Sequence, residues 1–167
     1  SMNNLTPSTM YYVRAYAVNA VGTCYSSQIS FTTNNGLPTV TTGTVNNITA
    51  TSAVCSGNVT SDGGIAVTAK GLCWSTAQYP TVAGDHSNNG SGVGSFNGSM
   101  SGLSVGTTYY VRAYATNSSG TAYGNQITFK TLTTIPTVVT NTASNITATS
   151  ATVGGNVTND GGSTIIA

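Results

Sequence analysis

Apolar and polar residues alternate along much of this chain, most clearly in residues 107–115, which read Thr-Thr-Tyr-Tyr-Val-Arg-Ala-Tyr-Ala. Successive side chains of a β-strand point to opposite faces, so the alternation predicts a strand with two unlike faces. The residues expected to face the core are Tyr109, Val111, Ala113 and Ala115. Those expected on the outer face are Tyr110, Arg112 and Tyr114.

Further stretches of alternating or β-branched residues, ended by Gly, Asn or Pro, predict additional strands. They span residues 11–17, 28–32, 38–42, 51–59, 66–75 and 95–98. The Asp-Gly-Gly sequence at 62–64 is expected to form a hairpin-type turn, and residues 84–94 a loop of small residues. No segment has the period of an amphipathic helix. Short strands separated by turns predict an all-β protein built as a β-sandwich.

A repeat with an offset of 98 residues runs through the chain. Residues 9–17 match residues 107–115, residues 47–53 match residues 145–151, and more than half of the aligned positions are identical without a gap. A gap-free period of this length is the size of one small domain. The sequence therefore predicts tandem β-sandwich repeats.

The repeat divides the chain into three parts. We expect one complete sandwich at residues 37–132, the C-terminal part of a preceding repeat, with its last two strands, at 1–34, and the N-terminal part of the next repeat at 135–167. Both ends fall inside a repeat, so we expect the sequence to be a window on a longer array. The linkers are very short, which limits the angles between neighbouring repeats.

Charge is scarce in this sequence. Charged residues make up 4% of the chain, against about 25% in typical soluble domains. A net charge of +1 leaves no field to attract nucleic acid or an anionic membrane, so neither is expected as a partner. No apolar run approaches the roughly 20 residues of a membrane-spanning helix. Ser, Thr and Asn replace the charges, which suits an extracellular, secreted or cell-surface setting.

Residues 103–117 resemble the fibronectin type III family, whose pattern is a Leu, then Pro-Gly-Thr, a Tyr, and alternating small apolar residues ending in Ala-x-Asn. The positions that fit are Leu103, Gly106, Thr107, Tyr109, Val111, Ala113, Ala115 and Asn117. Val105 replaces the proline, which the first copy keeps as Pro7. By this resemblance Tyr109 and Tyr11 are corner tyrosines whose hydroxyls tie the strand to the preceding loop.

The only tryptophan, Trp74, falls on the third expected strand, whereas the family carries one on the second. The whole repeat is more similar to the divergent fibronectin-like repeats of very large bacterial surface proteins. That resemblance implies a stalk or filament module of a secreted, adhesin-like protein. Its partners would be neighbouring repeats or subunits of an array, with glycans or surface proteins of a host or neighbouring cell as further candidates.

A candidate binding surface follows from the outer face of the strand at 107–115. If the third strand lies beside it, Lys70, Leu72 and Trp74 share that face with the two tyrosines and Arg112. Flat aromatic rings stack on sugars, and large exposed patches usually mark contacts. The alternative interpretation is cross-strand support, with the arginine lying over tyrosine rings. The pattern recurs as Tyr12, Arg14 and Tyr16, which suits a structural ladder.

The remaining polar residues give weak signals for chemistry. Asp85, Ser87 and Asn89 resemble the front half of a calcium loop, but no closing glutamate follows, so a polar loop is expected. His86 is the only histidine and has no serine or cysteine placed for activation. There are no paired carboxylates and no phosphate-binding glycine loop. We therefore expect a non-catalytic protein without a cofactor or metal.

The three cysteines leave the redox setting open. The second copy has Ala122 and Val153 where the first has Cys24 and Cys55, which indicates small apolar packing sites. A bridge between Cys55 and Cys73 remains an alternative if both point into one core.

Three functions compete at this point. The leading hypothesis is a structural segment of an extracellular stalk, adhesin or filament that projects or links. The second is a carbohydrate- or protein-binding module that uses the Tyr/Arg/Trp face. The third is assembly of partial end repeats by strand exchange between molecules, against which the end segments together lack the equivalent of residues 70–98.

Overall fold

A computed structural model describes all 167 residues as strands, turns and loops without a helix. In the central part the strands are β5 (Thr39–Asn46), β6 (Ser52–Ser61), β7 (Ala69–Ser75), β8 (Gly94–Ser101), β9 (Thr108–Asn117), β10 (Gly120–Tyr123) and β11 (Ile127–Lys130). The N-terminal segment holds β1 (Met10–Val13), β2 (Tyr16–Val18), β3 (Thr23–Tyr25) and β4 (Ile29–Thr32). The C-terminal segment holds β12 (Thr137–Thr140) and β13 (Gly155–Asn159).

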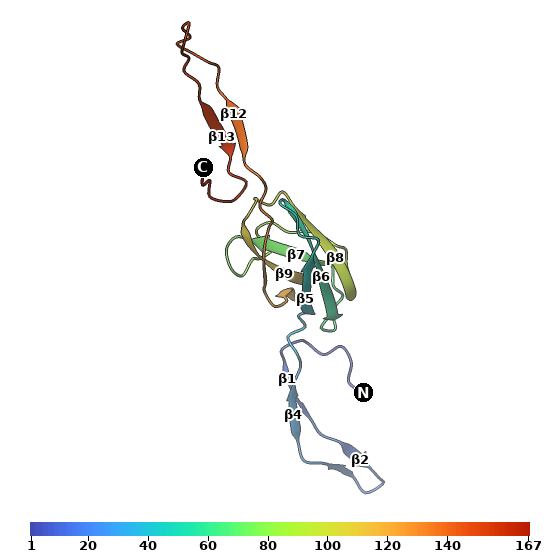
Figure 1. The fold of residues 1–167 in the computed structure, drawn as a ribbon. Coiled ribbons are helices and arrows are strands. Elements are labelled where there is room, and N and C mark those ends of the chain that lie inside the picture. Colours follow the sequence, from blue (N-terminus) through green and yellow to red (C-terminus); the bar gives the residue numbers. More distant parts are fainter.

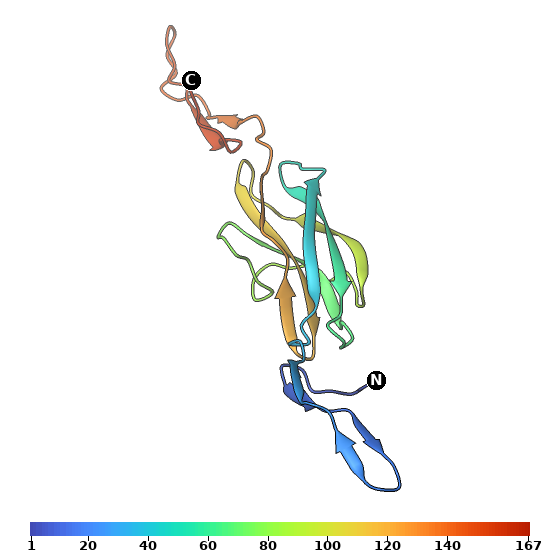
Figure 2. The same cartoon turned by 90° about the horizontal axis from the view of Figure 1, so that it is seen from below.

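Two sheets pack face to face in the central part (Figures 1 and 2). The first has the order β5-β6-β8, with β5 at an edge as its proline-led sequence predicts. In the second, β9 lies at the centre, with β7 on one side and both β10 and β11 along the other. This arrangement of seven strands is that of fibronectin type III-like and Ig-like sandwiches. The predicted all-β fold class is confirmed.

The chain reverses between the sheets at the Asp-Gly-Gly turn. Strand β6 pairs only with β5 and β8, and β7 belongs to the other sheet, so residues 62–64 do not close a hairpin as predicted. The Asp62 carboxylate accepts a hydrogen bond from the Gly64 backbone N–H at 2.9 Å. The turn thus carries the chain from one sheet to the other.

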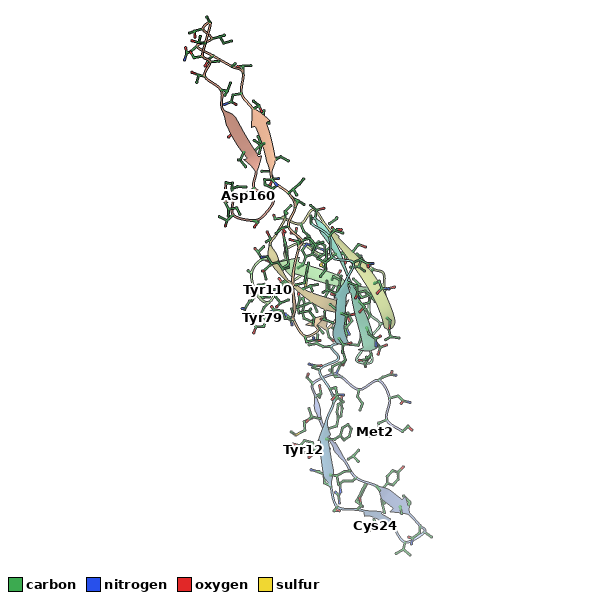
Figure 3. The ribbon with its side chains drawn as sticks, in the orientation of Figure 1. Met2, Tyr12, Cys24, Tyr79, Tyr110 and Asp160 are labelled. Carbon is green, nitrogen blue, oxygen red and sulfur yellow. The ribbon has the colours of Figure 1, made fainter.

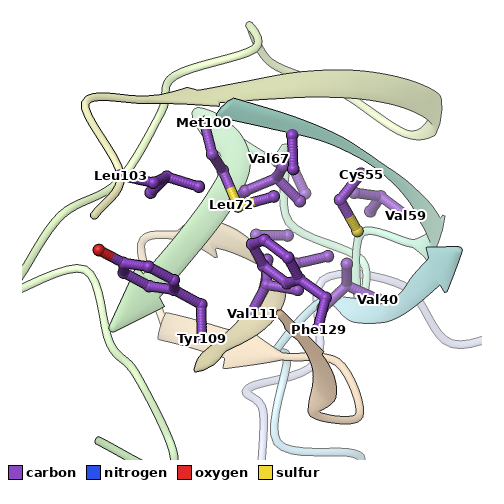
Figure 4. Close-up of a cluster of buried hydrophobic side chains, with 13 residues drawn as sticks. Val40, Cys55, Val59, Val67, Leu72, Met100, Leu103, Tyr109, Val111 and Phe129 are labelled. Atoms are coloured by element: carbon purple, nitrogen blue, oxygen red, sulfur yellow. The ribbon is translucent and has the colours of Figure 1, made fainter. Parts of the chain in front are cut away.

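The core lies between the two sheets and consists of 13 buried residues (Figure 4). Leu72 and Met100, from opposite sheets, are fully buried at its centre. The rings of Tyr109 and Phe129 stack at its edge, with their centroids 5.9 Å apart. Strand β9 contributes every second residue to this core, as its alternation predicts.

A tyrosine corner fixes the entry to β9. The Tyr109 hydroxyl accepts a hydrogen bond from the Ser104 N–H at 3.0 Å. In the N-terminal segment the Tyr11 hydroxyl accepts a hydrogen bond from the Thr6 N–H at 2.9 Å. Thr6 and Tyr11 lie 98 positions before Ser104 and Tyr109, respectively. The tie to the preceding loop that the family resemblance implied is therefore present in both copies.

The two copies of the motif differ in strand continuity. The N-terminal copy breaks the expected strand at 11–17 into β1 and β2, which pair with β4 and β3 respectively. The central copy is one continuous strand, β9. Along one edge of β9 the partner changes from β11, at residues 108–111, to β10, at residues 114–117, and β7 pairs with the other edge at residues 110–116, across this change. A strand supported along its second edge stays extended through that change of partner.

One buried hydrogen bond connects the sheets at this change of partner. The Thr42 hydroxyl of β5 accepts from the Ala113 N–H at 2.9 Å. Gly124 leaves room for it, since a Cβ there would lie 2.5 Å from the Thr42 Oγ1. In the N-terminal segment Ser26 occupies the position equivalent to Gly124, and its own hydroxyl accepts from the Ala15 N–H at 3.0 Å. Two different hydroxyls thus satisfy the same backbone group.

This exchange predicts a compensating pair of substitutions. Gly124→Ser should destabilise the sandwich by about 1–3 kcal/mol, because its Cβ crowds Thr42. Thr42→Ala should cost about as much, because it leaves the Ala113 N–H without an acceptor. The double variant should lose less than the sum, since the alanine removes the Oγ1 that crowds the new Cβ and the serine hydroxyl supplies an acceptor for the Ala113 N–H. Urea unfolding followed by Trp74 fluorescence measures the cycle, and additive losses would contradict it.

Candidate functional site

The register between β7 and β9 divides the predicted aromatic surface between two faces. Trp74 lies directly opposite Val111 and Leu72 opposite Ala113, so these side chains face the core. Leu72 is fully buried there, and Trp74 packs against the core as a half-buried residue. The expectation that Lys70, Leu72 and Trp74 share the outer face is wrong by one position of register, which moves every side chain to the other side.

Lys70 is buried within the sandwich and only 6% exposed. Its ammonium donates to the carbonyls of Val93 and Gly94 at 3.2 and 3.4 Å, and it lies 5.7 Å from the centre of the Phe96 ring. Carbonyl dipoles and an aromatic face therefore solvate this cation. Its contacts hold the end of the β7–β8 connection and leave no free charge for a ligand.

The outer face of the β9 sheet is partly covered. Tyr114 is only 4% exposed and lies across Gly71, where a Cβ would meet the tyrosine ring at 2.9 Å. Its hydroxyl donates to the Ser87 carbonyl at 2.9 Å, and the His86 ring meets it edge-on. Burial raises the pKa of Tyr114, and Cys73 and Tyr123 nearby add to the effect. This tyrosine supports the loop above it.

Arg112 has the supporting role that the alternative interpretation predicted. Its Nε donates to the Gly124 carbonyl at 3.0 Å, and its guanidinium lies 4.6 Å from the centre of the Tyr123 ring. In the N-terminal segment Arg14 donates to the Ser26 carbonyl at 2.8 Å and lies 5.0 Å from the Tyr25 ring. The arginine therefore braces the connection between β10 and β11 in the central copy, and the one between β3 and β4 in the N-terminal copy.

The other predicted site residues lie apart from one another. Tyr110 stands half-buried on the outer face opposite Ser75, while Tyr12 and Tyr16 are 63% and 70% exposed in the N-terminal segment. Figure 3 shows Tyr12 well separated from Tyr110, which lies on the flank of the sandwich. No single surface gathers the predicted set, and a ligand-binding role for these residues remains a prediction.

The segment predicted as a loop at 84–94 runs along the free edge of β7. The Ser87 N–H donates to the Leu72 carbonyl and the Asn89 N–H to the Lys70 carbonyl, at 2.8 and 2.7 Å. The Ser87 hydroxyl donates to the Asn89 side chain at 2.7 Å. Its polar groups are thus engaged in holding an additional edge, which protects β7 from pairing with another chain.

Neither buried cysteine forms a disulfide. Cys55 points into the core from β6, whereas Cys73 lies on the outer side of β7, opposite Arg112. The Cys73 Sγ is 3.3 Å from the Pro80 carbonyl. The alternative of a Cys55–Cys73 bridge is wrong, because the two thiols lie on opposite faces of the second sheet. Cys24 is exposed.

A feature that the sequence did not single out lies beside Tyr110. Residues between 74 and 84 line a small open cavity of about 230 Å³, and Tyr79 is exposed at its rim. Figure 3 shows Tyr79 on the same flank as Tyr110. The only signal in the sequence was a lone tyrosine before a proline in a polar loop.

No protein-family model and no curated protein matches the chain. Among solved structures, it is similar to the sensor domain of the anti-sigma factor RsgI4 of Pseudobacteroides cellulosolvens, at 24% identity over 57% of this chain and 94% of that one, with a TM-score of 0.43. Chicken CNTN1 domains FN1–FN3 match at 21% identity over 78% of this chain and 46% of that one, with a TM-score of 0.45. A human fibronectin type III domain from KIAA0970 matches at 12% identity over 56% of this chain and 72% of that one, with a TM-score of 0.37.

These similarities are too distant to transfer a function, and the strand order defines the class of the protein. The chain contains a fibronectin type III-like, Ig-like β-sandwich. The structure contains no helix that could cross a membrane.

The thiols give a direct chemical prediction. In the folded protein a chromogenic disulfide reagent should react quickly with Cys24 alone, because Cys55 and Cys73 are buried. After denaturation all three should react. Rapid reaction of a second thiol in the folded chain would contradict the placement of Cys55 or Cys73.

The same burial predicts a loss of stability at alkaline pH. Burial raises the pKa of Cys55 and Cys73 from 9.0 to about 11, although Arg112 partly opposes the effect at Cys73. Below pH 9 both thiols stay protonated in the folded and in the unfolded protein, so their full contribution to stability is present. Between pH 9 and 11 the unfolded thiols lose protons first, so the free energy of unfolding should fall.

Urea unfolding measured across this window tests the prediction. The variant Cys55→Val/Cys73→Ala should show a shallower decline than the native chain, and Val153 shows that valine is accepted at the first position in the other copy. An unchanged slope in this variant would mean that other groups cause the decline.

Proposed function

We propose that this chain is a spacer segment of a longer array of β-sandwiches, part of an extracellular or cell-surface stalk, adhesin or filament, bacterial by the resemblance of its repeats. The observation that supports this proposal most directly is the end-to-end arrangement of the three parts of the chain. In both views of the ribbon the N-terminal hairpins, the central sandwich and the C-terminal hairpin follow one another along a line (Figures 1 and 2).

Backbone contacts at the joints support a stiff connection. At the C-terminal joint a Cβ on Gly162 would lie 2.8 Å from the Val105 carbonyl oxygen, and one on Gly106 would lie 2.5 Å from the Gly162 oxygen. The loop before β9 and the Asp-Gly-Gly turn of the following segment therefore touch through their backbones. The Thr134 N–H also donates to the Gly161 carbonyl at 2.9 Å.

The start of the central sandwich is held in a similar way. The Asn117 side chain donates to the carbonyls of Gly36 and Asp62, at 2.6 and 2.9 Å, and so ties the linker to the Asp-Gly-Gly turn. A Cβ on Gly36 would lie 3.2 Å from the Pro7 ring of the preceding segment. Short linkers fixed by hydrogen bonds restrict bending between neighbouring domains.

Small-angle X-ray scattering on arrays of one to four whole repeats tests the spacer function. The maximum dimension should grow by roughly 35–40 Å per repeat, the length of a ten-residue strand with its loops. An array whose dimensions barely grow with added repeats, or that scatters as a flexible chain, would contradict it. Electron microscopy of the parent protein should show the same axial spacing.

The joint contact predicts a matched pair of variants in the present chain. Gly162→Val should broaden the scattering distance distribution, because its side chain overlaps the Val105 carbonyl and its φ of +75° is strained for valine. Gly154→Ala, which meets only an ordinary contact with Asn141 at 3.6 Å, is the control and should leave the distribution unchanged. Equal behaviour of the two would mean that the turn does not stiffen the joint.

A further inference from the structure

We propose that the cavity at residues 74–84, which we call the Tyr79 cup, binds a pyranose ring of a neutral oligosaccharide. The cup has a volume of about 230 Å³. Its lining residues are Trp74, Ser75, Ala77, Gln78, Tyr79, Pro80, Thr81 and Gly84. The proposal concerns one flank of the sandwich and does not depend on the spacer function.

The chemistry of the lining selects the ligand class. Tyr79 provides an exposed aromatic ring, on which the C–H face of a sugar ring packs, while Trp74 borders the cup at the end of β7 with its side chain packed against the core. Ser75, Gln78 and Thr81 offer hydroxyl and amide groups that can both donate and accept hydrogen bonds, as sugar hydroxyls require. No charged side chain lines the cup, so nothing in it compensates an ionic ligand. The volume lies below that of typical drug-sized sites and suits a single ring.

The loop that forms the cup is held in place before any ligand arrives. The Tyr79 N–H donates to the Gln126 side chain, and the Val82 N–H donates to the Tyr123 hydroxyl at 3.2 Å. The Ala77 N–H donates to the Ser75 hydroxyl at 3.0 Å. A preformed loop loses little conformational freedom on binding, which favours affinity.

Tyr79 has a backbone conformation that is unusual for its residue type. Its φ is +58°, a region that bulky residues rarely adopt, yet its side chain is 67% exposed and adds little to the core. Backbone strain of this kind is concentrated at binding sites and active sites. The ring is thus held out into solvent at an energetic cost, beside a polar cavity.

The single tryptophan provides a fluorescence signal for binding in the cup. Trp74 is the only tryptophan in the chain and lines the cup, so its fluorescence responds to an occupant. We would titrate the intact chain with cellohexaose, maltohexaose and chitohexaose up to about 10 mM, enough to saturate a site of millimolar Kd. Saturable emission changes with at least one sugar, and shifts of NMR signals from residues 74–84, are expected.

Tyr79→Asn separates binding from folding. Asparagine accepts positive φ more readily than tyrosine, so the variant should unfold at the same or a higher urea concentration. Loss of the ring should weaken binding by roughly tenfold or more. Tyr12→Asn, which removes an equally exposed tyrosine from β1, is the control and should bind as the native chain does.

Two results would overturn the proposal. One is the absence of any emission or NMR change with all three sugars. The other is binding that Tyr79→Asn leaves unchanged, which would place the sugar elsewhere on the chain. Neither result bears on the length increments of the repeat arrays, so the spacer function is tested separately.

Discussion

The pairing of β7 with β9 is the constraint on which the rest of the sandwich depends. Strand β9 is hydrogen-bonded along both edges and contributes every second residue to the core. Because Leu72 must lie opposite Ala113 to reach that core, the register of β7 is fixed, and a shift of one residue would expose Leu72. The same register places Gly71 under the ring of Tyr114, which in turn anchors the segment along the edge of β7.

The sequence was informative about local pattern and uninformative about register between distant strands. The faces of β9 were predictable because the small apolar residues Val111, Ala113 and Ala115 alternate with Arg112 and Tyr114. Residues 71–74 read Gly-Leu-Cys-Trp and have no polar position that marks the outer side. Their pairing partners lie about 40 positions away, so only the three-dimensional register decides that Trp74 faces inward. The Tyr79 cup was unpredictable because it depends on Gln126 and Tyr123 from another hairpin.

With so little charge, side-chain hydroxyls and amides connect the parts of this protein. Thr42 joins the two sheets, Asn117 ties the linker to a turn, and the Thr131 hydroxyl bridges the Thr107 N–H and the Ser104 carbonyl. No buried side-chain nitrogen or oxygen lacks a hydrogen-bond partner. Neutral hydrogen bonds do not weaken in salt as exposed ion pairs do, so this design suits an environment of variable ionic strength.

The joints and the Tyr79 cup use different parts of the sandwich. The C-terminal joint is made by backbone atoms of an Asp-Gly-Gly turn and the loop before β9, whereas at the N-terminal joint the Asn117 side chain holds the linker beside the Pro7 ring. The two joints lie at the two ends of the long axis (Figure 1). The cup is made by one continuous loop on the flank, held from the β10–β11 hairpin, and none of its residues takes part in the joint contacts. Under the two proposals, substitutions in that loop would change the sugar that the flank binds and leave the joint contacts as they are. A repeat built this way can keep its length while its loop diverges.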